Sequence, residues 1–146
     1  MGAVILLLPL AAQGIVTLLD EFYFHHRRGL RKWEVWGHPL DTLTVAAAYG
    51  FLLLAGPSTE NLWVFGALAL FSCLFVTKDE FVHHELCEAR EQWLHSLLFL
   101  LHPVAFLAAG RLWWEGITTP ILGQLALTIL FLFYQIIYWG IPWRTK

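Results

Sequence analysis

Five stretches of this chain carry almost no charge, and each is long enough to cross a lipid bilayer. A helix needs about 20 mainly apolar residues to span the hydrocarbon core. The uncharged stretches cover residues 1–19, 42–59, 61–77 and 116–143, and a fifth, 92–110, is interrupted only by histidines. Inside a bilayer the backbone polar groups of a spanning segment must pair with one another, which a helix achieves. We therefore expect an all-α integral membrane protein with five transmembrane helices.

The composition favours a membrane protein over a soluble domain. Of 146 residues, 58% are hydrophobic and only 14% are charged, whereas a soluble domain has about 25% charged residues. The first stretch could also be a secretory signal, but it lacks the basic start of one. We expect it to remain as an uncleaved helix. The expected partner is the lipid bilayer, and we expect no nucleic acid.

The basic residues predict an orientation in the membrane. With five spans, eight of the nine basic residues fall on one side, and only Arg111 lies on the other. Cytoplasmic loops are enriched in lysine and arginine. We therefore expect the N-terminus outside, and the C-terminus in the cytoplasm together with the loops that follow the first and third spans.

A motif rich in acids and histidines occurs twice, each time between two apolar stretches. The first copy is Asp20, Glu21, Phe22, His25, His26, Glu34, Trp36 and His38, and the second is Asp79, Glu80, Phe81, His83, His84, Glu91, Trp93 and His95. The first part of the motif, from Asp20 to His25, recurs after a shift of 59 residues and the second part after a shift of 57. Two blocks with constant shifts are typical of a tandem duplication.

The duplication predicts how the chain is organised. We expect one membrane domain over 1–146, with a first helical hairpin at 3–56, a second at 61–110 and an extra helix at 117–143. The two hairpins would form a four-helix bundle, with both motifs at its cytoplasmic end. The oligomeric state is left open.

The spacing within the motifs indicates a metal site. Each copy offers two Glu–His pairs at i and i+4, a spacing that places both side chains on one helix face. Four such faces in a bundle would provide four carboxylates and four imidazoles, close to the donor set of di-iron carboxylate bundles. The candidate ligands are Glu21, His25, Glu34, His38, Glu80, His83, His84, Glu91 and His95, with His26, Asp41, Asp79 and His102 as possible additions. Gly37 and Pro39 leave open whether Glu34 and His38 lie on a helix.

Two further residues near the motifs have alternative interpretations. His102 lies seven residues beyond His95 and roughly 10 Å deeper along the helix, so it either belongs to the site or hydrogen-bonds to a neighbouring helix. Cys87 is either an additional ligand or a cysteine at the membrane interface.

Acidic and histidine clusters at the cytoplasmic ends of transmembrane helices resemble the integral-membrane di-iron oxygenases, the fatty-acid desaturases and hydroxylases. The resemblance is one of plan, because those proteins have more histidines, fewer glutamates and longer chains. It implies a site with two metals near the cytoplasmic membrane face and a lipid-like substrate, and it leaves room for a redox partner.

These observations favour an oxidoreductase that binds two metal ions and acts on a lipid-like or apolar substrate. We expect iron first, zinc second and haem third. The alternatives are a metal-ion transporter or sensor, a b-type cytochrome, and a zinc-dependent lipid hydrolase. A purely structural role is also open, in which the glutamates form ion pairs with Arg27, Arg28 or Arg90.

Overall fold

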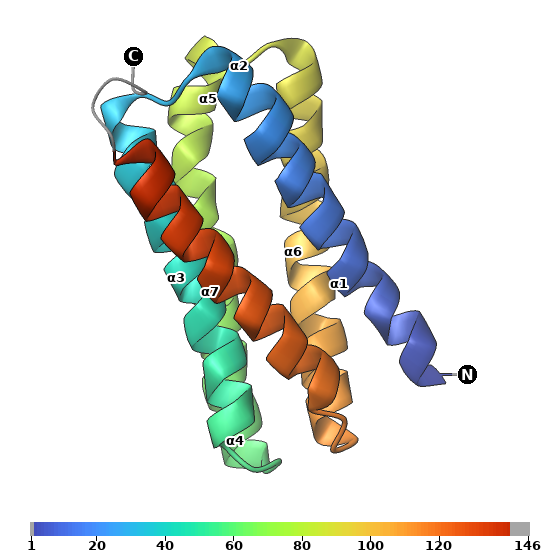
Figure 1. The fold of residues 1–146 in the computed structure, drawn as a ribbon. Helices are drawn as coiled ribbons and strands as arrows, with labels where there is room; N and C mark the ends of the chain where they lie inside the picture. The colour runs from blue at the N-terminus through green and yellow to red at the C-terminus, as the bar shows by residue number, and fades with distance from the viewer. Residues whose placement is uncertain (1, 141–146) are drawn as a thin grey trace.

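The computed structural model describes residues 2–140, which are almost entirely helical (Figure 1). This confirms the all-α prediction. Five long helices make up most of the fold: α1 (Gly2–Leu19), α3 (Lys32–Leu54), α4 (Thr59–Phe75), α6 (Ala89–Trp114) and α7 (Thr119–Trp139).

Four short elements extend two of the long helices at the end of the molecule that carries the motifs. The π-helical turn η1 (Asp20–His25) and α2 (His26–Arg28) continue α1, and the 3₁₀ turn η2 (Val76–Asp79) and α5 (Glu80–Leu86) continue α4. Gly29, with φ of 75°, ends the first of these rods. A left-handed backbone of this kind is most easily adopted by glycine.

Within residues 2–140, four helical stretches are long and apolar enough to cross a membrane. They are Val4–Arg28, Thr59–Leu86, Ala89–Trp114 and Thr119–Trp139. The expected second span, which lies in α3, falls short of this. Although α3 has 23 residues, its first ten include Lys32, Glu34 and Asp41, so its fully apolar part is brief.

The long helices form an open ring in the order α1, α6, α4, α3, α7. Each neighbouring pair in this order is in extensive contact, while α1 and α7 stand apart at the two edges of the ring (Figure 1). In this ring the two helices of the expected first hairpin are not neighbours, because α1 packs mainly on α6 and α3 packs on α4 and α7. A cavity of about 480 Å³ is lined by residues of α1, α3, α6 and α7 and of the short elements η1, η2 and α5.

The apolar core lies in the half of the molecule away from the motifs. Tyr49 and Trp113 are fully buried there, and the indole N–H of Trp113 donates to the backbone carbonyl of Ala55 over 2.9 Å. Gly110 lies against Phe65, so closely that a β-carbon on Gly110 would be 2.9 Å from the ring. The core holds one end of the ring together and leaves the other end to polar residues.

Candidate metal centre

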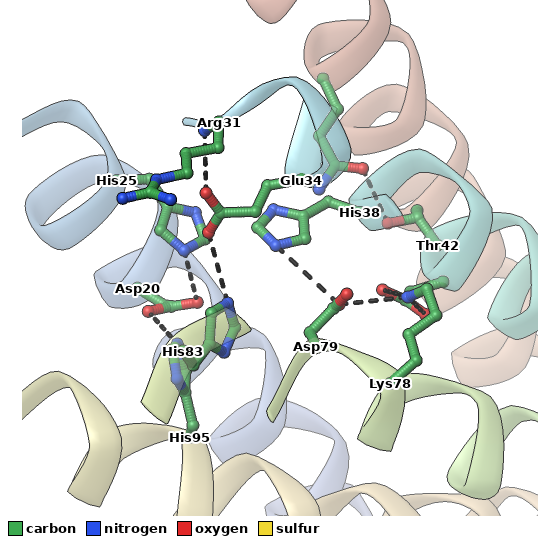
Figure 2. Close-up of polar contacts among 12 residues, drawn as sticks. Asp20, His25, Arg31, Glu34, His38, Thr42, Lys78, Asp79, His83 and His95 are labelled. Carbon is green, nitrogen blue, oxygen red and sulfur yellow. Dashed lines mark hydrogen bonds and ion pairs between the residues drawn. The ribbon is translucent and has the colours of Figure 1, made fainter. Parts of the chain in front are cut away.

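Four imidazole rings meet at the polar end of the ring (Figure 2). His25 comes from η1, His38 from α3, His83 from α5 and His95 from α6, and all four are buried. Their ring centroids are 4.7 Å apart for His25 and His38, and 4.2 Å apart for His83 and His95. The other two neighbouring pairs are separated by 6.1 and 6.3 Å, so the four rings form a closed set.

Five carboxylates surround the imidazoles. They belong to Asp20, Glu21, Glu34, Asp79 and Glu91, and all are buried. Asp20 is the most central of them, because its carboxylate lies 3.0 Å from Nε2 of His95 and 3.4 Å from Nε2 of His25. Glu34 lies 3.4 Å from Nε2 of His83. We call these nine residues the polar cluster.

The donor atoms of the cluster are close enough to share metal ions. Within the described residues, four groups have donor atoms that all lie within 4.8 Å of one another. The groups are Asp20, His25, Glu91 and His95; Glu21, His25 and His38; Glu34, His38 and His83; and His83, Cys87 and His95. Because His25, His38, His83 and His95 each belong to two groups, the sites adjoin one another.

Several buried nitrogen atoms of the cluster make no hydrogen bond. Among the described residues these are Nε2 of His25, both ring nitrogens of His83 and Nδ1 of His95, and Oδ1 of Asp79 is similarly unpaired. Nearly all buried polar atoms in proteins have a partner, so such atoms need an explanation. A metal ion accepts lone pairs of this kind, and the residues present therefore fit a bound metal.

The cluster has a surplus of negative charge. Arg28 donates to both oxygens of Glu34, at 2.9 and 2.6 Å, and to Glu91 at 3.1 Å. Lys78 pairs with Asp79 and with the neighbouring Asp41. The five carboxylates of the cluster thus outnumber these two basic side chains, while burial and the neighbouring Asp79 raise the pKa of Asp41 to about 8, so that Asp41 holds a proton at pH 7. Buried charges are costly unless they are compensated, so the cluster requires bound cations or protons.

The two α3 members of the cluster differ in their ionisation. Burial disfavours the charged form of Glu34, but His83, Arg28 and the backbone N–H of Arg31 outweigh it and hold the pKa of Glu34 well below its usual range. Burial, reinforced by His25, lowers the pKa of His38 to about 4. Glu34 is therefore a carboxylate and His38 a neutral imidazole at pH 7, and these are the forms that bind metal.

Local helix geometry decides which residues face the cluster. In the first motif the π-helical turn is wider than an α-helical one, so a residue shares a face with those four and five positions before it. Asp20, Glu21 and His25 accordingly all point inward. Glu34 and His38 lie on α3, which begins at Lys32, so Gly37 and Pro39 do not prevent a helix there. Gly37 also lets α3 approach η2, because a β-carbon on it would be 3.2 Å from Asp79.

The second motif corrects the expected placement of Glu80 and His84. Both are exposed and belong to none of the four donor groups, whereas their neighbours Asp79 and His83 are buried in the cluster. Asp79 and His83 are separated by four residues and share the inner face of the rod. Each helical residue is rotated by about 100° from the one before it, so Glu80 and His84 point outward.

The remaining predicted residues lie around the cluster. His26 is exposed, hydrogen-bonds to the hydroxyl of Tyr134 and stacks on Tyr138. His102 hydrogen-bonds to Gln13 and Ser72 on neighbouring helices, at 2.6 and 3.0 Å. Cys87 is half-buried and belongs to one donor group. Of the four predicted Glu–His pairs, three lie in the polar cluster: Glu21 with His25, Glu34 with His38, and Glu91 with His95.

Three members of the site were not expected as such from the sequence. Asp20 was recognised as part of the motif but not as a ligand, although its recurrence as Asp79 was a usable signal. Arg28 appeared only as one of several arginines that could form ion pairs. Trp139 of α7 donates its indole N–H to Glu21, and no sequence pattern pointed to this bond.

The fold and the cluster define the protein as helical, with several membrane-length segments and a buried site that could hold metal. Comparison with protein-family models, curated protein sequences and solved structures found no match to this chain.

Proposed function

We propose that this chain is an integral membrane protein that binds two iron ions in the polar cluster and oxidises a lipid-like or apolar substrate at the cytoplasmic face. The observation that carries this proposal is the closed set of four buried imidazoles inside five carboxylates, with unpaired donor atoms and more acids than bases. Bound divalent cations would balance this excess of negative charge.

The donor set favours iron over harder or softer metals. Magnesium and calcium prefer oxygen ligands, while thiolate-rich sites favour zinc and copper(I). A mixed set of imidazoles and carboxylates is the one that di-iron bundle proteins use. An iron pair supplies the capacity to activate oxygen for the oxidation of an unreactive C–H bond.

The surrounding residues would hold the ligands in place. Arg28 joins Glu34 of α3 to Glu91 of α6, and Trp139 of α7 fixes one oxygen of Glu21. Residues that orient ligands are important because their loss commonly reduces metal affinity 10- to 100-fold. The fifth long helix therefore contributes to the site, although it supplies no ligand.

The alternatives are supported less well. Haem would need space between two axial histidines, whereas the closest ring pairs are in direct contact. A transporter would need ligands along a path, but the charged residues gather at one end of the cavity. Zinc is the second candidate, because Cys87 lies with His83 and His95 and thiolates are good zinc ligands. A zinc site would indicate hydrolysis.

Two adjacent histidines provide the sharpest test. His83→Ala should remove most of the bound metal, because His83 lies in two donor groups, while His84→Ala should retain it, because His84 is exposed. Metal content is measured by elemental mass spectrometry on detergent-purified protein, together with the visible spectrum. We expect about two irons per chain in the unsubstituted protein.

Different results would reject different parts of the proposal. Equal metal content in the two variants would reject the polar cluster as the site. Zinc without iron would reject oxidation and favour a hydrolase. A Soret band would reject the iron pair and favour a haem protein. No metal after reconstitution with ferrous iron would reject metal binding altogether.

A further inference from the structure

The cavity beside the polar cluster continues far beyond it. Its walls include a long stretch of α1 and η1, from Leu10 to Glu21, and of α7, from Gln124 to Gln135. Its volume, about 480 Å³, lies within the range of small-molecule sites, about 300–1,000 Å³. The cluster therefore forms only one end of a larger cavity.

The cavity opens at the surface between α1 and α7. Ile15 and Leu18 of α1 line it, yet they are 59% and 48% exposed, and Leu127 of α7 lines it and is 64% exposed. Side chains that line a cavity and also meet the surroundings mark its mouth. This mouth is apolar and lies within two of the membrane-length stretches, so it faces the lipid chains in the proposed orientation.

Two neutral polar side chains, both partly buried, also line this apolar space. Gln13 on the α1 wall and Gln124 on the α7 wall both line the cavity. Gln13 is seven residues from Asp20 along its rod, which places it roughly 10 Å from the cluster. The acids that line the cavity, Asp20, Glu21, Asp41 and Asp79, belong to the cluster or adjoin it.

A chain of hydrogen bonds orients the amide of Gln13. Its N–H group donates to Nδ1 of His102, whose Nε2 then donates to Ser72, and Ser72 donates to Thr44. Thr44 in turn donates to the backbone carbonyl of Asp41. In this direction of donation, the side-chain carbonyl oxygen of Gln13 accepts no hydrogen bond from the other members of this series.

We propose that the cavity binds a single-chain amphiphile with an uncharged hydrogen-bonding group, such as a long-chain alcohol, which enters from the membrane between α1 and α7. The hydroxyl would donate to Gln13 and accept from Gln124, and the apolar chain would extend to the cluster. Because it names the substrate class of the proposed oxidoreductase, this inference rests on the proposed function.

The chemistry of the walls selects this class of molecule. A plain hydrocarbon would offer no hydrogen-bonding partner to the carbonyl oxygen of Gln13 or to the amide of Gln124, and leaving such groups unpaired away from water is costly. A charged ligand would find no counter-charge beside Gln13 and Gln124, because the acids and bases lie at the other end. A neutral group on an apolar chain satisfies both parts of the cavity.

The test uses hexadecanol that carries a photoreactive diazirine in mid-chain, added to the full-length protein in phosphatidylcholine vesicles. We expect crosslinks on the cavity faces of α1 and α7, and we expect unlabelled hexadecanol to compete while hexadecane does not. Gln13→Leu and Gln124→Leu should each weaken the competition about fivefold, the loss for one hydrogen bond. Gln92→Leu, outside the cavity wall, is the matched control and should have no effect.

Two results would overturn the inference. One is crosslinking spread evenly over the outer faces of the helices, and the other is equal competition by the alkane and the alcohol. Metal content is measured on the same samples, so the two proposals separate. Specific crosslinking in protein that binds no metal would reject the proposed function and keep the binding cavity, and bound iron without specific crosslinking would do the reverse.

Discussion

Arg28 is the residue on which the charge balance of the cluster depends most directly. It reaches two carboxylates from different helices, Glu34 at 2.6 Å and Glu91 at 3.1 Å, and its side chain is only 17% exposed. Removing one partner of a buried ion pair leaves an uncompensated charge, which costs more than the pair itself contributes.

Arg28→Leu should therefore destabilise the metal-free protein by about 2–4 kcal/mol. Added metal should recover more stability in this variant than in the unsubstituted protein, because cations replace the lost charge. Thermal unfolding in detergent, with and without ferrous iron, measures both effects. Arg27→Leu is the control, because Arg27 is exposed and contacts only Tyr23 in the described structure. Similar losses in the two variants would contradict the role assigned to Arg28.

At the scale of helices, close packing in the apolar half sets how well the polar half is aligned. Gly110 of α6 faces Phe65 of α4, and a β-carbon there would lie 2.9 Å from the ring. Gly66, one residue after Phe65, has open space around its α-carbon. The two glycines thus differ in their surroundings but not in their helical backbone.

Gly110→Ala should lower the stability of the protein by about 1–3 kcal/mol, the usual cost of overpacking. Gly66→Ala should be neutral or slightly stabilising, because alanine favours a helix where space permits. The apparent unfolding temperature in one detergent and at one pH distinguishes the two. Equal shifts would show that α4 and α6 are not in close contact at this point.

The element scale is also where prediction from the sequence reaches its limit. The long apolar stretches predicted the helices, because hydropathy reports on segment length directly. They did not predict that α1 packs on α6, since lipid-facing and helix-facing surfaces are both apolar. The inward placement of Asp79 and His83 depends on the 3₁₀ turn η2, which ends at Asp79, and that of Asp20 on the π-helical turn η1. Neither turn can be recognised from a pattern of i and i+4 pairs. The tandem duplication stays a prediction.

For the whole molecule, the ionisation of the α3 residues predicts how stability depends on pH. His38 has a pKa of about 4 in the folded protein, below the ordinary value of about 6.5. Between these values the unfolded chain binds a proton that the folded chain does not. Stability must therefore fall as the pH falls through this window. Glu34, whose pKa is also lowered, adds a loss in the same direction at lower pH.

Metal-free protein should lose about 3 kcal/mol through His38 between pH 7 and pH 4. Thermal unfolding measured across this range should show a smaller pH dependence in His38→Leu than in the unsubstituted protein. His84→Leu, which replaces an exposed histidine outside the cluster, should follow the unsubstituted protein. A pH dependence that is unchanged in His38→Leu would show that His38 is not the group that titrates.

The open ring also has a mechanical consequence. The bonds that cross the gap between its edges, from Trp139 to Glu21 and from Tyr134 to His26, lie at the polar end. The two edge helices, α1 and α7, are therefore joined at the polar end, and this end would act as a hinge if their other ends moved apart. A molecule that pushed the far ends of α1 and α7 apart would therefore shift the position of the Glu21 carboxylate. Occupancy of the cavity would then act on Glu21, a proposed metal ligand, through the two edge helices as well as by direct contact at the cluster.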